Sequence, residues 1–444
     1  MRRVTRAIVV CNIVFGWAST GTAGQATLRA PTAANVDLSS LYRAREDWIV
    51  TLRRSGRRER ISVAMKHVAI TALMVGLILS GCSSIGVRPV DYTFTTPLST
   101  IPLGLRPVTD HRKDFAPVFC KAMQQYPGDR TSADCRAYLQ LDASLAPPVP
   151  FPPLPPLGDK YRVIVVAGIF SACLPKEAAI FKQGLEALVK DGMKSADEIP
   201  ISASGGSAPN AKIIADYIRQ HRDPDRPYIA IGYSQGAVDL LQAYVDDDVV
   251  RSSIAAVITI AGAVGGSRLP DGFSPGLIKA LGGLEAHLPQ CTIKNLNDGI
   301  NTLRRETRVN FLVDHASVLP RSYSVAAKST YKTTSKVLQG GWKQLSAYSI
   351  DQDSQVIRDE AAVPGGAFLG TALGDHWAVA LPFSEAHNPL FDAGIDHNHF
   401  PRTALIEAMV RFAINDLEIT HSADWLEHRG RTARSRANRH AARP

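Results

Sequence analysis

Short, continuous apolar runs recur through the middle of the chain. They lie at residues 163–167, 228–231 and 254–260 and are rich in valine, isoleucine and alanine. An apolar run without polar alternation is typical of a strand that is buried on both faces of a parallel sheet. We therefore expect three central strands in this part of the chain.

Amphipathic segments alternate with these runs. Apolar residues recur with helical spacing at 177–189, 211–218 and 237–245, and again near the C-terminus at 403–414. Strands joined by helices imply a mostly parallel sheet, because each connection must cross over a face of the sheet. The predicted fold class is α/β, with helices on both faces of the sheet.

Segments outside this pattern divide the chain further. Residues 83–146 form a small N-terminal segment, and the proline-rich stretch 147–157 indicates a stiff linker. Proline fixes φ and has no N–H to donate, so such a run stays extended. We expect the α/β domain over residues 158–421 and a basic, disordered tail over 422–444.

The formal net charge of +9 is concentrated at the two ends of the chain. Residues 1–64 hold 11 Arg and four acidic residues, and residues 425–444 hold six Arg and one Glu. The body between them is mildly acidic, and no recognition motif accompanies the basic ends. The pattern therefore argues against a nucleic-acid partner.

An export signal is predicted at residues 65–82. Lys66 gives a short positive flank to a largely apolar run at 68–79, which is short for a permanent membrane-spanning helix. The run ends in Leu-Ser-Gly-Cys, which resembles the lipobox of bacterial lipoproteins. The resemblance implies that Cys82 is lipidated and anchors the chain in the bacterial cell envelope, at the outer membrane and facing the periplasm. The alternative is a buried helix with an incidental cysteine.

Residues 1–64 precede this signal and show no sustained periodicity. We interpret them as an over-extended reading frame, with translation starting at Met65. The alternative is a first export signal, in which Arg2, Arg3 and Arg6 flank an apolar run that Asn12 interrupts.

Four cysteines remain when the leader and Cys82 are set aside. An even set in an exported protein suggests two disulfides, for which three connectivities exist. We favour Cys120 with Cys135, since both lie in one small segment, which leaves Cys173 with Cys291. Four unpaired thiols are the alternative. No cysteine or histidine spacing indicates a metal site.

The strand predicted at 228–231 runs directly into Gly-Tyr-Ser-Gln-Gly at 232–236, and a helix follows. This is the G-x-S-x-G pentapeptide in the strand–turn–helix context that its chemistry requires. The turn is so tight that the serine takes a strained conformation, which exposes its hydroxyl above the sheet edge. Ser234 is therefore the predicted nucleophile. The N–H of Gln235, at the start of the helix, is a predicted oxyanion donor.

On these residues the chain resembles the α/β-hydrolase superfamily, in its bacterial lipase and esterase branch, over about residues 160–415. In that family a strand that ends in a small residue and a glycine is followed by the residue that supplies the second oxyanion N–H. Here the pair is Ala167-Gly168, so the resemblance implies Ile169. The family usually has histidine where Ala167 stands, which leaves Phe170 as the alternative.

The family order is serine, acid, histidine, and it guides the choice of the other two residues. The sequence at 352–356 resembles the N-D-G-x-V turn that carries the acid in lipases, with Ser354 in place of glycine. The resemblance implies Asp353 as the acid. His376 follows it by 23 positions, similar to the spacing in bacterial lipases, and is the favoured base. Asp375 is read as a turn or cap residue.

Other acidic and histidine residues remain open as alternatives. His397 and His399 are the rival bases, and Asp351 and Asp314 are the rival acids. His315 precedes the predicted acid and is read as a surface or core histidine.

The segment from 261 to 308 is longer than a strand connection requires, with helical apolar spacing inside it. In the family, insertions near this place form caps over the acyl pocket, and Cys291 would pin such a cap to Cys173. A helix that packs on the core without a gating role is the alternative.

Together these residues predict a serine hydrolase that cleaves a carboxylic ester of a small molecule or lipid, with no cofactor or metal. An acyltransferase or thioesterase would use the same three residues. A non-catalytic envelope lipoprotein that uses the fold for binding is the alternative from another class. The sequence does not indicate an oligomeric state.

Overall fold

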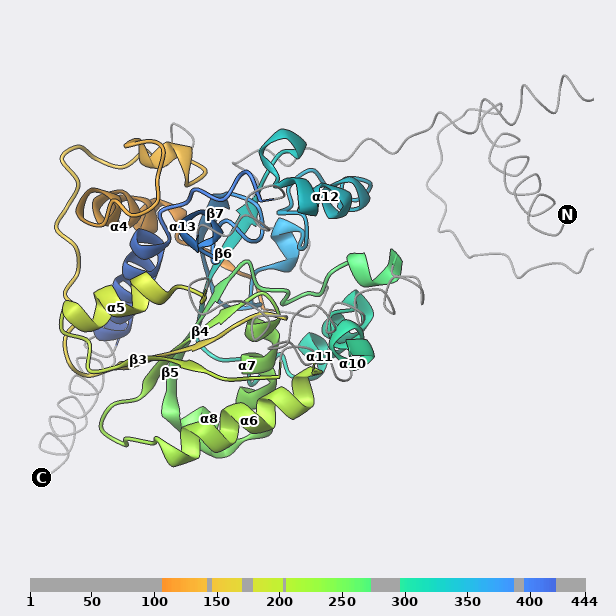
Figure 1. Cartoon of the computed structure of the whole chain (residues 1–444). Coiled ribbons are helices and arrows are strands. Elements are labelled where there is room, and N and C mark those ends of the chain that lie inside the picture. Colours follow the sequence, from red (N-terminus) through yellow and green to blue (C-terminus); the bar gives the residue numbers. More distant parts are fainter. Residues whose placement is uncertain are drawn as a thin grey trace, which may run out of the picture. The chain divides into compact units, whose positions relative to one another are not determined.

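The computed structural model describes residues 106–141, 146–169, 179–202, 205–272, 296–386 and 395–420. In this part of the chain, seven strands form one sheet, in which every neighbouring pair is parallel. The strands are β1 (Thr109–Asp110), β2 (Arg162–Val166), β3 (Ala196–Ile199), β4 (Tyr228–Tyr233), β5 (Ile254–Ile260), β6 (Ser322–Lys328) and β7 (Ala367–Leu373). Their order across the sheet is β1-β7-β6-β5-β4-β2-β3 (Figure 1).

The helices connect and cover these strands. The α-helices are α4 (Arg112–Gln125), α5 (Lys182–Lys190), α6 (Ser207–Gln220), α7 (Gln235–Asp246), α8 (Asp248–Ser253), α10 (Leu296–Thr302), α11 (Arg305–Asp314), α12 (Gln339–Leu345) and α13 (Phe383–Ala386). Short 3₁₀ helices are η1 (Cys135–Ala137), η5 (Leu269–Gly272), η7 (Tyr331–Thr333), η8 (Lys336–Leu338) and η9 (Arg358–Glu360). A further helix spans residues 402–420. Among the described residues, no helix is long and apolar enough to cross a membrane.

Both faces of the sheet are buried, which explains the continuous apolar runs. Along β2, Val163 and Val165 pack with α4, α5 and the helix at 402–420, whereas Ile164 and Val166 pack with α6, α7 and α8. The two groups of helices lie on opposite sides of the sheet (Figure 1). Since successive side chains of a strand point to opposite faces, a strand covered on both sides is expected to be largely apolar. The predicted α/β class with a parallel, doubly covered sheet is confirmed.

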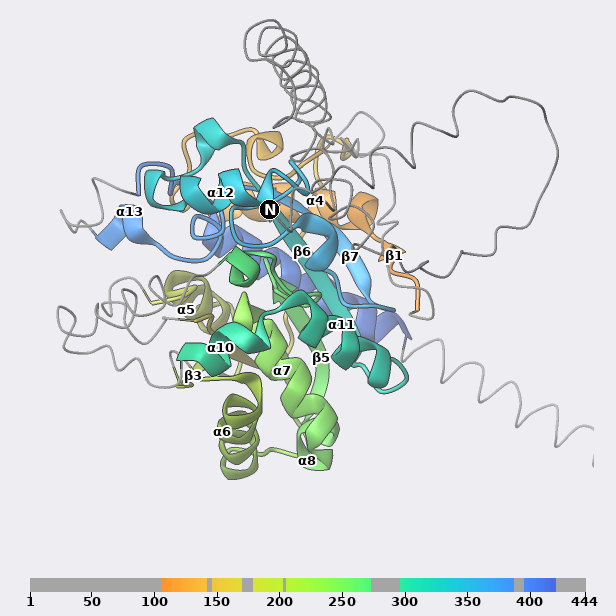
Figure 2. The same ribbon diagram turned by 90° about the vertical axis from the view of Figure 1, so that its right-hand side faces the viewer.

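The N-terminal segment belongs to this sheet. Thr109 and Asp110 of β1 pair with Ala367 and Phe368 of β7, so β1 forms one edge (Figure 2). Helix α4 packs beside β7, and its Phe115 and Phe119 are buried in the core.

Two departures from the predicted elements have a clear physical cause. Helix α5 begins at Lys182 rather than at 177, because Phe181 before it has a left-handed conformation with φ of 50°. Strand β3 was not predicted, since its sequence Ala-Asp-Glu-Ile is half polar. Because β3 is the other edge of the sheet, it tolerates polar side chains that a central strand would exclude.

Candidate active site

The turn between β4 and α7 carries Ser234 in a strained conformation. Its φ is 55° and its ψ is −121°, a region that non-glycine residues rarely occupy and that costs about 1–3 kcal/mol. Main-chain hydrogen bonds hold the turn. The Ser234 N–H donates to the Ile260 carbonyl over 3.3 Å, and the Ser234 carbonyl accepts from Ala263 over 3.1 Å. The end of β5, the strand next to β4, therefore holds the main chain of Ser234 in place.

The two glycines of the pentapeptide are required by close approach. A Cβ atom at Gly232 would lie 2.4 Å from the Cα of Ala237. A Cβ at Gly236 would lie 2.0 Å from the carbonyl oxygen of Val166, at the end of β2. Both distances are shorter than real Cβ contacts, so only glycine lets the first turn of α7 rest on the sheet at this point.

The structure brings Ser234, His376 and Asp353 together. Nε2 of His376 lies 2.8 Å from Oγ of Ser234, and Nδ1 lies 2.8 Å from Oδ2 of Asp353. The three residues follow β4, β7 and β6 in the chain, and parallel strands present their carboxyl ends at one sheet edge. Their exposed fractions are 7%, 4% and 1%, so bulk water competes little with these hydrogen bonds.

The turn at Asp353 leaves one carboxylate oxygen for the histidine. Oδ1 accepts from the N–H groups of Gln355, over 2.9 Å, and Val356, over 2.7 Å. Ser354 has a positive φ of 82°, at the position where the lipase turn has glycine. Because an ionised carboxylate only accepts, Nδ1 of His376 donates to Oδ2, and Nε2 is left to accept the Ser234 proton.

The main chain around His376 is held on both sides. The His376 N–H donates to the Asp353 carbonyl over 2.8 Å, and its carbonyl accepts from the Tyr233 hydroxyl over 2.7 Å. Burial raises the pKa of Tyr233 well above its usual value, so the hydroxyl remains a donor. Tyr233 occupies a variable position of the pentapeptide, and sequence reasoning gave it no role.

Asp375 caps the loop that follows β7 by accepting main-chain hydrogen bonds. Its carboxylate accepts from the N–H groups of Trp377 (3.1 Å), Ala378 (2.9 Å) and Ser335 (2.8 Å). Burial raises the pKa of Asp375, against the effect of these hydrogen bonds. The interpretation as a turn or cap residue agrees with these contacts.

The rival histidines lie in other surroundings. His399 is half exposed, with 53% of its side chain accessible, and its Nδ1 lies 2.6 Å from Oδ1 of Asp129. His397 is exposed, and its N–H donates to Ser335. His315 packs against Phe311 at the end of α11. The imidazole that reaches Ser234 is that of His376.

Of the two rival acids, one pairs with other side chains and the other is exposed to solvent. Asp351 is buried and forms ion pairs with Lys328 and with Arg358, the latter over 3.5 Å. Asp314 ends α11 and is exposed.

The chain near the Ser234 hydroxyl includes Gln235 and Gly168, the residue before Ile169. Gln235 is the first residue of α7, where a helix N–H has no acceptor within the helix. Its buried side chain donates to the Gly205 carbonyl over 2.7 Å. A Cβ at Gly168 would lie 3.3 Å from the Ser234 Oγ, so the chain passes close to the hydroxyl immediately before Ile169. Phe170 lies outside the described residues.

Cys120 and Cys135 form a disulfide that ties η1 to α4. The predicted lipidation site Cys82 and the predicted pair Cys173 and Cys291 lie outside the described residues, as does the middle of the predicted cap. Within the described ranges, no group of three or more His, Cys, Asp or Glu side chains is arranged to hold a metal ion.

Solved structures with a related architecture exist. The metagenomic carboxyl esterase MGS0156 is 29% identical, with 70% of this chain and 93% of that chain covered and a TM-score of 0.64. Mature lipase BlEst2 of Bacillus licheniformis is 21% identical, with 52% and 89% covered and a TM-score of 0.39. EstA from Clostridium botulinum is 10% identical, with 68% and 97% covered and a TM-score of 0.38.

No protein-family model matches the chain, and no curated protein sequence matches it. The parallel sheet, its helices on both faces and the similarity to the MGS0156 structure show that the chain has the α/β-hydrolase fold.

Proposed function

We propose that this α/β-hydrolase-fold protein is a serine hydrolase that cleaves carboxylic esters. The observation that carries the proposal is the hydrogen-bonded series Ser234–His376–Asp353, with 2.8 Å at each step. A serine hydroxyl becomes a nucleophile when an imidazole can take its proton and a carboxylate holds that imidazole. The similarity to a structure named as a carboxyl esterase supports an ester as the substrate class.

The first half-reaction forms an acyl-enzyme. Oγ of Ser234 attacks the ester carbonyl carbon while Nε2 of His376 takes the hydroxyl proton. The carbonyl oxygen becomes an oxyanion, which the N–H groups of Gln235 and Ile169 stabilise. The intermediate then collapses. The bond to the alcohol oxygen breaks, and His376 gives its proton to that oxygen.

The second half-reaction releases the acid. Water attacks the acyl carbon and passes a proton to Nε2 of His376. The bond to Oγ then breaks, and the proton returns to Ser234. Throughout, Asp353 stabilises the imidazolium and holds its orientation.

Strain at Ser234 adds to this argument. A conformation that costs about 1–3 kcal/mol persists where the surroundings impose it, and such residues are concentrated at functional sites. In this turn, the strained φ places Oγ within hydrogen-bond reach of His376. A serine with a structural role alone would not require that position.

A fluorophosphonate probe, which phosphonylates activated serines, tests the proposal directly. The full chain should be labelled and should hydrolyse p-nitrophenyl esters. The Ser234→Ala and His376→Gln variants should lose both activities. Ser324→Ala is a matched control, since Ser324 is a buried serine on β6 that hydrogen-bonds to Thr259. An unlabelled, well-folded wild-type protein would refute the proposal and would favour a binding role for the fold.

We further propose that the chain is exported and anchored through lipid on Cys82. The support is the sequence at 65–82, with its positive flank, short apolar run and terminal Leu-Ser-Gly-Cys. Bacteria that express the full chain should incorporate an alkynyl palmitate analogue into it, and Cys82→Ala should abolish incorporation. A wild-type chain without label, in cells that label their other lipoproteins, would contradict the anchor.

A further inference from the structure

The N-terminal segment hydrogen-bonds to the end of β7, just before the loop that carries His376, and it reaches the other side of that loop through Arg402. We call residues 374–381, between β7 and α13, the base loop. On the side where β7 ends, the Gln140 N–H donates to the Thr371 carbonyl over 2.9 Å, and the Leu373 N–H donates to the Tyr138 carbonyl over 2.8 Å. These bonds fix the strand that leads into the base loop.

Arg402 holds the other side of the base loop. Its Nη1 donates to the carbonyl of Ala378 over 2.8 Å, two residues after His376. Nη1 also donates to the Asn398 carbonyl over 2.8 Å, so the guanidinium joins the two stretches of chain. Only 6% of the Arg402 side chain is exposed. A cation this deeply buried needs a partner of opposite charge, because burial removes its hydration.

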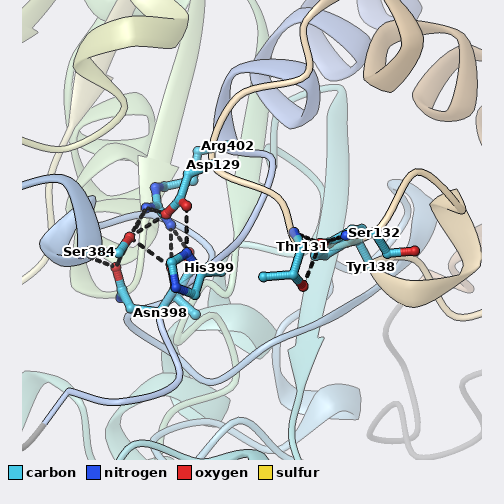
Figure 3. Close-up of polar contacts among 9 residues, drawn as sticks. Asp129, Thr131, Ser132, Tyr138, Ser384, Asn398, His399 and Arg402 are labelled. Atoms are coloured by element: carbon cyan, nitrogen blue, oxygen red, sulfur yellow. Dashed lines mark hydrogen bonds and ion pairs between the residues drawn. The ribbon is translucent and has the colours of Figure 1, made fainter.

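Asp129 of the N-terminal segment supplies that charge. Its Oδ2 accepts from Nη2 of Arg402 over 3.0 Å and also from the Ser384 hydroxyl of α13. Its Oδ1 faces Nδ1 of His399. Figure 3 shows Arg402, Ser384 and His399 around this one carboxylate. The rival base His399 therefore belongs to the cluster that supports the base loop.

The position of Asp129 is itself fixed. Asp129 forms an antiparallel bridge with Phe400. The Tyr138 hydroxyl accepts from the N–H groups of Thr131 and Ser132, the second over 2.8 Å (Figure 3). The Tyr138 ring also packs edge-on against Phe400, with centroids 5.7 Å apart. Tyr138 thus holds the loop that carries Asp129 and also hydrogen-bonds to Leu373 at the end of β7.

We propose that Asp129 and Arg402 are positioning residues for the reaction. Through the Ala378 carbonyl, they hold the base loop where Nε2 of His376 meets Ser234. The proposal rests on the proposed function and assigns the N-terminal segment a part in it. A shift of about 1 Å in a catalytic group can lower the rate about 100-fold, so support of this loop bears directly on turnover.

Asp129→Asn keeps the shape of the side chain and removes its charge. Asp191→Asn is a matched control, because Asp191 also pairs with an arginine of the 402–420 helix, Arg411, over 2.9 Å. Asp191 additionally accepts from Tyr126 of the N-terminal segment. Among the described residues, neither Asp191 nor Arg411 hydrogen-bonds to the base loop, so this pair reproduces the ion pair without its link to His376.

The measurement is the separation of kcat from KM on p-nitrophenyl esters, well below the melting temperature. We expect Asp129→Asn to lower kcat about tenfold or more, with KM within about twofold, as expected when transition-state geometry alone is lost. Asp191→Asn should keep wild-type kcat. Equal kcat values for the two variants would overturn the proposal.

A second pair of variants applies if Asp129→Asn does not fold. Arg402→Lys keeps the charge but cannot hold Ala378 and Asp129 with two separate nitrogens, and Arg411→Lys is its control. We expect only Arg402→Lys to lose kcat. Fluorophosphonate labelling separates this test from that of the proposed function. If the wild-type protein is labelled and Arg402→Lys keeps the wild-type kcat, the positioning role alone is refuted. If the wild-type protein is not labelled, the proposed function itself is refuted.

Discussion

The Tyr233 hydroxyl donates a 2.7 Å hydrogen bond to the His376 carbonyl, and the two rings lie 5.0 Å apart. The residue before the nucleophile therefore supports the main chain of the base. The contact links β4 to the loop after β7 across the width of two intervening strands.

Tyr233→Phe should lower kcat modestly, by about three- to tenfold. The ring packing is retained, but the buried carbonyl of His376 loses its donor, a loss of about 1–3 kcal/mol when the group stays unsatisfied. Steady-state ester hydrolysis measures the effect. Tyr323→Phe is the control, since Tyr323 is also buried but hydrogen-bonds to Asp416. A wild-type kcat in Tyr233→Phe would show that this contact does not support the base.

Asp353→Asn should lower kcat by about 10³–10⁴-fold with little loss of stability, because the imidazole loses its orienting carboxylate. Asp351→Asn should do the opposite. It removes the buried carboxylate that faces both Lys328 and Arg358, and breaking a buried ion pair costs about 3–5 kcal/mol of unfolding free energy. Kinetics and urea unfolding on both variants separate the two carboxylates. If Asp351→Asn lost most of its kcat while Asp353→Asn stayed active, Asp351 rather than Asp353 would be the residue that catalysis requires.

Glu360 should make stability depend on pH. Burial raises its pKa to about 7, although Arg268 and Arg305 oppose the shift. Between pH 5 and 7 the folded state therefore keeps a proton that the unfolded chain has lost, and the contribution of Glu360 to stability falls as the pH rises through 7. Glu360→Gln should flatten this part of the profile.

Urea unfolding at several pH values between 5 and 8 measures that slope. Glu306→Gln, which removes an exposed carboxylate of α11, should leave the slope unchanged. An unchanged slope in Glu360→Gln would mean that Glu360 titrates alike in both states.

Removal of the Cys120–Cys135 disulfide should lower the unfolding free energy. The two cysteines are 15 positions apart. Closing a loop of this length lowers the entropy of the unfolded chain, which raises the free energy of unfolding by about 3 kcal/mol. The double variant Cys120→Ala/Cys135→Ala removes this bond alone, whereas a reductant would also reach other cysteines. Non-reducing urea unfolding measures the loss. A variant as stable as the wild type would contradict the expectation.

Strands β2, β4 and β5 were predictable because their apolar runs are buried on both faces of the sheet. Strand β5 has the predicted bounds, Ile254–Ile260, and β4 continues two residues beyond its predicted end into the pentapeptide. Strands β1 and β3 were not predictable in the same way. β1 has two residues, and β3 is half polar, so neither has an apolar pattern of its own.

For the site, the pentapeptide and its context pointed to Ser234, whereas the histidine remained a choice among several. Histidine order and spacing do not show which ring the fold brings to the serine. That depends on contacts such as the one between His399 and Asp129, which are 270 positions apart. Asp129 lies in a segment without a recognisable catalytic pattern, so its place beside the base loop could not be inferred from sequence.

The pairing of β1 with β7 joins residues that are far apart in the chain, which bears on the expected order of folding. Thr109 and Ala367 become neighbours only after nearly all of the domain between them has been synthesised, and closing so long a loop costs entropy before any contact compensates for it. The edge strand is therefore expected to dock late. Until it does, the start of β7 presents unpaired backbone groups, to which another chain could pair.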